Sequence, residues 1–101
     1  MSKYKNIKTR GFASKKEAAR NTDLRLLERA GEITDLRQQV RYTFDQLRYP
    51  SGRKPSYIAD FTYTTREGEF VCEDTKGYST PLYKLKFALM QYFHNITVLE
   101  T

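Results

Sequence analysis

The sequence predicts an α/β domain with a four-stranded mixed sheet flanked by two helices, in the order α-β-β-β-α-β. Three observations lead to this expectation. The 101 residues suit one domain with a single modest core. Two segments combine helix start signals with the helical spacing of apolar residues. Four other segments have the alternation, or the β-branched and aromatic content, that is typical of strands.

The two helices are predicted from their end signals. The first helix opens with a capping box at Ser14. It runs to about Ala30, and Gly31, the next residue, suits a left-handed cap. The second opens at Pro81, which suits the first helical position, and runs to about Phe93. The expected apolar faces comprise Ala19, Leu24, Leu26, Leu27 and Ala30 in the first helix and Leu82, Leu85, Leu89 and Phe93 in the second.

The four strands are expected at residues 34–44, 57–64, 70–76 and 96–99. A tight reversal around Gly68 joins the second and third strands into an antiparallel hairpin. If the hairpin pairs about Gly68, position 60 lies opposite roughly position 76. Residues 1–13 are polar, basic and without period, so we expect a flexible arm followed by one domain over 14–101.

Composition restricts the kind of partner. The net charge is +6, from 18 basic and 12 acidic residues, which favours a polyanionic partner but also suits a basic protein kept soluble by its charge.

Cys72 is the only cysteine, and a single cysteine excludes an intramolecular disulfide and a cysteine-based zinc cluster. We expect Cys72 to be a buried thiol. No apolar run approaches a membrane span and the N-terminus has no apolar signal core, so a cytoplasmic setting is expected.

Acidic residues within apolar strands mark the candidate site. Asp60 and Asp74 have apolar neighbours, where a charged group is costly unless it is paired, hydrated or bound to metal. Strand side chains alternate, so Asp74 and Lys76 share one face and Glu73 points away, unless a bulge exchanges the faces of Glu73 and Asp74. Two carboxylates beside a lysine suit Mg²⁺-assisted phosphodiester hydrolysis. The alternative is that these are surface charges at strand ends.

This pattern resembles the PD-(D/E)xK nuclease superfamily. Asp60 corresponds to the first acid, and Asp74 and Lys76 correspond to the acid and lysine of the second motif. Ala59 replaces the usual proline. More narrowly, the chain is similar to small phage-encoded endonucleases related to Holliday-junction resolvases. The segments that carry this likeness are Ser14–Ala18, Leu26–Ile33, Tyr57–Phe61, Glu73–Gly77 and Tyr83–Lys86.

The resemblance implies a restriction-endonuclease-like core and a Mg²⁺-dependent DNA endonuclease, in which Mn²⁺ can substitute. Asp60 and Asp74 would bind metal, Lys76 would assist the water or the transition state, and Glu17 would match a further acid that many members place on the first helix. Branched DNA is the implied substrate, in phage DNA metabolism within the host cytoplasm. A homodimer is expected because cutting two strands symmetrically needs two active sites.

Several alternatives stay open. Glu17 is also the preferred third residue of a capping box. Basic side chains could hold DNA phosphates or could simply be solvated; the candidates are Lys15, Lys16, Arg53, Lys54, Lys84 and Lys86. The chain could be a catalytically inactive nucleic-acid-binding protein on the same fold, or a basic scaffold that binds a partner. RNA also stays open as the substrate, because nothing identifies a reader of the 2′-hydroxyl.

Overall fold

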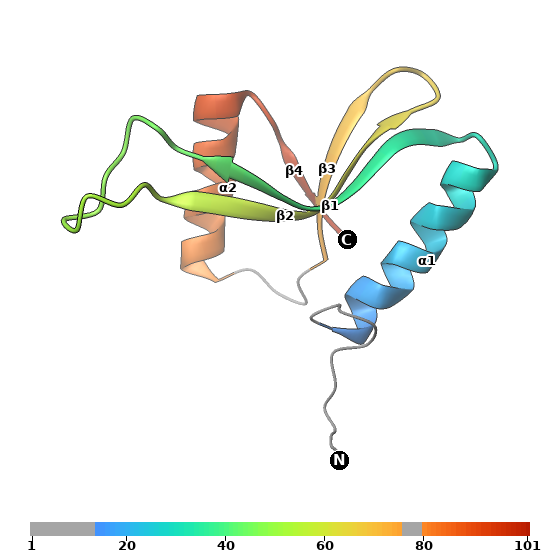
Figure 1. Cartoon of the computed structure of the whole chain (residues 1–101), viewed down its shortest axis with the longest axis horizontal. Coiled ribbons are helices and arrows are strands. Elements are labelled where there is room, and N and C mark those ends of the chain that lie inside the picture. Colours follow the sequence, from blue (N-terminus) through green and yellow to red (C-terminus); the bar gives the residue numbers. More distant parts are fainter. Residues whose placement is uncertain (1–13, 76–79) are drawn as a thin grey trace, which may run out of the picture.

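A computed structural model, which describes residues 14–75 and 80–101, has the predicted order of elements (Figure 1). The predicted arm at 1–13 lies outside the described residues. The two helices lie well apart, with the strands between them (Figure 1). The elements are α1 (Lys15–Arg29), β1 (Ile33–Thr43), β2 (Ser56–Thr65), β3 (Phe70–Asp74), α2 (Pro81–His94) and β4 (Val98–Glu100).

The sheet is mixed and its strands follow the order β1-β2-β3-β4. The first three strands pair antiparallel, whereas β3 and β4 pair parallel. A parallel pair needs a crossover connection, and α2 provides it. The predicted α/β class and the α-β-β-β-α-β order are therefore confirmed.

The helix ends follow the predicted signals. The Ser14 hydroxyl accepts a hydrogen bond from the Glu17 backbone N–H at 3.1 Å, and Gly31 follows the helix with φ +82°. Thr80 caps α2 in the same way, through the N–H of Tyr83 at 3.2 Å. Asn95 ends α2 in the left-handed conformation that asparagine tolerates. Local residues therefore fix both ends of each helix: Ser14 and Thr80 through their side chains, Gly31 and Asn95 through a left-handed backbone.

Strand β2 contributes to two separate clusters of buried side chains. Tyr57 and Ala59 pack with α2, and Phe61 and Tyr63 pack with Leu24 of α1. Asp60 lies at the changeover between the two clusters. The first cluster comprises Phe44, Tyr57, Ala59, Cys72 and Met90, and the second comprises Leu24, Ile33, Phe61 and Tyr63. The prediction of a buried Cys72 thiol is confirmed.

The predicted apolar helix faces were wrong in part. Leu26 is 58% exposed on α1, and Leu82 and Leu85 are each 56% exposed on α2. In α1 the buried residues are Glu17 and Leu24, whereas Ala19, Leu27 and Ala30 of the predicted face are also exposed. In α2 the side chains of Tyr83 and Phe87 pack against the first buried cluster. The Phe87 ring lies edge-on to the Tyr57 ring, with the ring centroids 5.8 Å apart.

The predicted hairpin register was also wrong, by two residues. Phe61 pairs with Glu73 and Thr64 pairs with Phe70, so the reversal is centred on position 67 rather than on Gly68. The cause is the turn itself, because the Thr65 N–H donates to the Glu69 carbonyl oxygen and the Gly68 N–H donates to the Thr65 carbonyl oxygen. Position 60 is therefore level with position 74, not with position 76.

Candidate active site

Asp60 is held in one orientation by the chain that follows β3. Its side chain is buried, and its Oδ2 accepts hydrogen bonds from both the backbone N–H and the hydroxyl of Thr75, at 2.8 and 2.9 Å. The other oxygen, Oδ1, accepts a longer contact of 3.4 Å from the side-chain amide of Gln39. Because Thr75 directly follows Asp74, these bonds tie the two predicted acids together at the end of the β2–β3 hairpin.

Asp74 is wholly buried at the last position of β3. Its Oδ2 accepts a hydrogen bond of 2.7 Å from the Tyr57 hydroxyl. Burial raises the pKa of Tyr57 well above its usual value, and the hydrogen bond to Asp74 and the charges of Asp74 and Asp60 raise it further. The Tyr57 hydroxyl is therefore close enough to both carboxylates for their charges to disfavour its ionisation. Sequence reasoning missed the role of Tyr57, because a tyrosine in a strand gives no sign of where its hydroxyl lies.

Glu17 does more than cap its helix. Its backbone N–H binds the Ser14 hydroxyl, as a capping box predicts, but its side chain is buried and reaches the sheet. There Oε2 accepts a hydrogen bond of 2.7 Å from Nε2 of Gln39. The same amide contacts Asp60, so Gln39 links the acid of the first helix to the acid of β2. Sequence reasoning also missed Gln39, which has an unusual backbone conformation with φ +52°.

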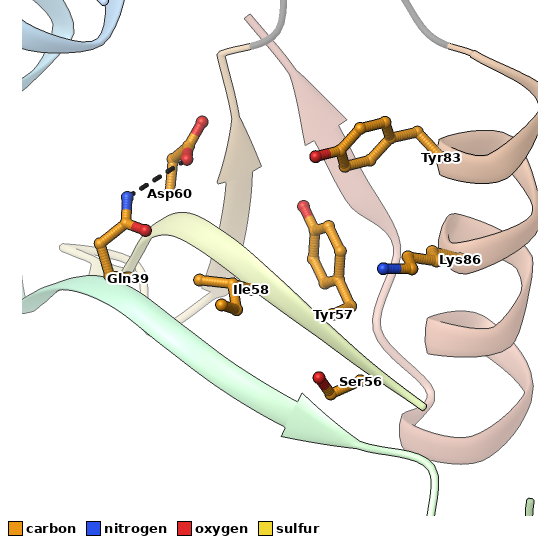
Figure 2. A pocket seen from close by; sticks show the side chains of 7 residues that line it. All are labelled: Gln39, Ser56, Tyr57, Ile58, Asp60, Tyr83 and Lys86. Carbon is orange, nitrogen blue, oxygen red and sulfur yellow. Dashed lines mark hydrogen bonds between the residues drawn. The ribbon is translucent and has the colours of Figure 1, made fainter. Parts of the chain in front are cut away.

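A pocket of about 250 Å³ opens beside these acids (Figure 2). Asp60 and Gln39 form one wall, and Tyr83 and Lys86 point from α2 toward the strands on the other side. The full lining comprises Gln39, Ser56, Tyr57, Ile58, Asp60, Tyr83 and Lys86. The pocket thus places an acid and a primary amine on facing walls, which is suited to a phosphodiester held by the amine and attacked near the acid.

Glu73 points away from this pocket, as the strand alternation predicted. It is wholly buried and accepts two hydrogen bonds from the Arg20 guanidinium, at 2.8 and 2.6 Å, and one from the Tyr63 hydroxyl. The pairing of β2 with β3 is regular from Phe61 to Thr64, so the bulge that would have exchanged Glu73 and Asp74 does not occur there. Burial and the bond to Glu73 raise the pKa of Tyr63 to about 12.

The remaining predicted residues are dispersed. Lys76 lies outside the described residues, so its position relative to Asp74 stays a prediction. Lys16 lines a second cavity, of about 310 Å³, together with Arg20 and Thr75. Lys15 is exposed at the start of α1 and Lys84 is exposed on α2. Arg53 and Lys54 lie in the connection between β1 and β2, which projects away from the sheet in Figure 1, and Lys54 pairs there with Asp45 at 3.2 Å.

The donor chemistry of the acids suits a hard divalent cation. In the described parts of the chain, no three Asp, Glu, His or Cys side chains form a group that could hold a metal ion. Asp60 and Asp74 instead offer a pair of carboxylates, and Oδ1 of Asp60 is not used by Thr75. Mg²⁺ is commonly bound through one or two carboxylates, with water and substrate phosphate completing its shell. The pair therefore fits Mg²⁺, while Glu17 is joined to it through Gln39.

The fold and the site define a small α/β protein in which the buried Asp60, linked to Glu17 through Gln39, lines a pocket that Lys86 borders on the other side. Residues 1–99 match the family described as "Protein of unknown function (DUF1064)", and the chain belongs to this family. Comparison with curated proteins and with solved structures gave no match. Within the described ranges, neither helix is long and apolar enough to cross a membrane.

Proposed function

We propose that this protein is a metal-dependent DNA endonuclease of the PD-(D/E)xK type, which hydrolyses phosphodiester bonds. The observation that carries the proposal is the buried pair of Asp60 and Asp74. Burying two carboxylates at the end of one hairpin is unfavourable unless hydrogen bonds or a cation compensate for it. Thr75 and Tyr57 provide hydrogen bonds, and the pocket beside Asp60 gives access to a substrate.

Each side chain has a defined part in this proposal. Asp60 and Asp74 hold Mg²⁺ or Mn²⁺, and Thr75 and Tyr57 keep these carboxylates oriented. A divalent cation supplies Lewis acidity toward the scissile phosphate and makes a water molecule more acidic. Lys86 holds the phosphate from the opposite wall of the pocket. Lys76, as the sequence motif implies, positions the attacking water or stabilises the charge of the transition state.

The substrate and setting remain those implied by the sequence. The proposed substrate is branched DNA, and the proposed setting is phage DNA metabolism within the host cytoplasm. A homodimer would bring two active sites to the two strands. The net charge of +6 supports a polyanionic partner. The basic residues outside the pocket would then contact the backbone without reading sequence.

A catalytically inactive nucleic-acid-binding protein is the second candidate. One observation favours it: the acids of the described residues do not form a three-ligand metal group. This candidate predicts DNA binding that is sensitive to salt but does not lead to cleavage.

A gel assay on radiolabelled four-way junction, duplex and single-stranded DNA separates the two candidates. Each substrate is incubated with the wild-type protein and with Lys76→Ala, in Mg²⁺ or in EDTA. We expect cleavage that needs Mg²⁺ and is lost in the variant, most strongly on the junction. Binding to these substrates without cleavage, in Mg²⁺ and in Mn²⁺, would favour the inactive DNA-binding protein.

A further inference from the structure

Gln39 has a backbone conformation that strand residues rarely adopt. Among the described residues, three other than glycine have a positive φ: Asp35, Gln39 and Asn95. Asn95 ends a helix, where this conformation is common for asparagine. Gln39 instead lies inside β1 with φ +52°, and glutamine has no intrinsic preference for this region. Backbone outliers of this kind concentrate at functional sites.

The unusual backbone lets two consecutive side chains reach the same helix. The amide of Gln38 donates to Asn21 of α1 at 2.8 Å, and the amide of Gln39 donates to Glu17 of α1 at 2.7 Å. In a regular strand, neighbouring side chains point to opposite faces, so only one of the two could meet α1. The left-handed turn at Gln39 therefore redirects its amide toward the acids.

The chemistry of the amide suits a link between two carboxylates. Nε2 carries two hydrogens, and it lies 2.7 Å from Oε2 of Glu17 and 3.4 Å from Oδ1 of Asp60. An amide holds both acids without cancelling their negative charge, whereas a lysine or arginine at this position would neutralise it. Gln39 also lines the pocket beside Asp60, so the link forms part of the wall of the proposed site.

We propose that Gln39 is a positioning residue that joins Glu17 to Asp60 and thereby orients the Asp60 carboxylate for a divalent cation held by Asp60 and Asp74. The inference rests on the proposed metal-dependent function, and it identifies the contact that brings Glu17 to the pair of Asp60 and Asp74. Groups that orient metal ligands usually change metal affinity by about 10- to 100-fold when they are removed. Loss of the Gln39 amide should have an effect of this size.

The test measures Mn²⁺ binding to the full chain by electron paramagnetic resonance, without DNA. Gln39→Gly removes the amide and suits a positive φ, so the fold should be kept. Asp35→Gly is the matched control, because it relaxes the other positive φ of β1, at φ +55°, and the described side-chain bond of Asp35 is with the exposed Arg37. We expect Gln39→Gly to weaken Mn²⁺ binding by about 10- to 100-fold, and Asp35→Gly to leave it unchanged.

A second comparison asks whether Gln39 acts through Glu17. If it does, Glu17→Gln should weaken Mn²⁺ binding, and adding Gln39→Gly should weaken it little further, because coupled residues are not additive. Equal affinity in the wild type and in Gln39→Gly would overturn this inference alone. Absence of Mn²⁺ binding by the wild type would overturn the proposed function, and this inference with it. Thermal melts of each variant verify that the fold is kept.

Discussion

The ion pair between Arg20 and Glu73 gives the sharpest prediction about stability. Glu73 is wholly buried on β3, and two nitrogens of Arg20 bind its two oxygens at 2.8 and 2.6 Å. In Arg20→Met, the carboxylate would keep only the Tyr63 hydroxyl as a described partner. Methionine retains most of the apolar length of the arginine side chain, so the main change is the loss of the positive charge.

The expected loss is large for a domain of this size. Removing one partner of a buried ion pair destabilises a protein by about 3–5 kcal/mol. The Arg20 side chain is 29% exposed, so water partly screens the pair and we expect a loss near the lower end, about 3 kcal/mol. Domains of this kind have about 5–15 kcal/mol of total stability. At about 4–8 °C per kcal/mol, the melting temperature should fall by roughly 12–24 °C.

Urea unfolding followed by circular dichroism measures this loss. Arg25→Met is the control, because Arg25 lies on the same helix and its pair with Glu28 is exposed, so it should change the free energy of unfolding by less than about 1 kcal/mol. Adding Glu73→Gln to Arg20→Met should restore part of the stability, since it removes the uncompensated charge. If Arg20→Met were as stable as Arg25→Met, the buried pair would not hold α1 against the sheet.

Three further predictions follow from the site and its surroundings. Tyr57→Phe removes the hydroxyl that binds Asp74 and should lower the free energy of unfolding by about 1.5–3 kcal/mol; an unchanged urea midpoint would contradict that hydrogen bond. Tyr63 has its pKa raised from 10.0 to about 12 in the folded state, so its contribution is full below pH 10 and is lost as the pH rises toward 12; Tyr63→Phe should therefore show a shallower alkaline loss of stability in a pH series of urea titrations. Lys86→Ala should weaken junction binding equally for all DNA sequences and reduce the salt slope by about one, which fluorescence anisotropy at several salt concentrations measures; an unchanged slope would exclude a phosphate contact.

The fold was predictable because its signals are local. Ser14 and Pro81 mark the helix starts by side-chain chemistry that acts within one turn, and the β2–β3 hairpin follows from a tight reversal. The position of a reversal within its turn is less certain from sequence, because it depends on which backbone groups bond. This is why Asp60 is level with Asp74 rather than with position 76.

Of the candidate site, the sequence allowed only the acidic residues to be predicted. Charged residues within apolar strands are visible in the sequence, so Asp60 and Asp74 could be chosen and brought together by the hairpin. The residues that orient the acids could not be found in this way. Gln39 acts through a backbone conformation that no local pattern indicates, and Tyr57 acts through a hydroxyl at the end of a buried ring. The helix faces were predicted only in part for the same reason, since the spacing of apolar residues does not indicate that Glu17 is buried against the sheet while Leu26 is exposed.

The central claim is that Asp60 takes part in phosphodiester hydrolysis. The most direct test is the single-turnover rate of junction cleavage in Mg²⁺ by the wild type, by Asp60→Asn and by Asp45→Asn, an exposed control on the β1–β2 connection. Junction binding in EDTA is measured alongside. We predict that Asp60→Asn loses at least about a hundredfold in rate while it still folds and binds DNA, and that Asp45→Asn cleaves like the wild type. Equal cleavage by Asp60→Asn and the wild type would contradict the proposed active site.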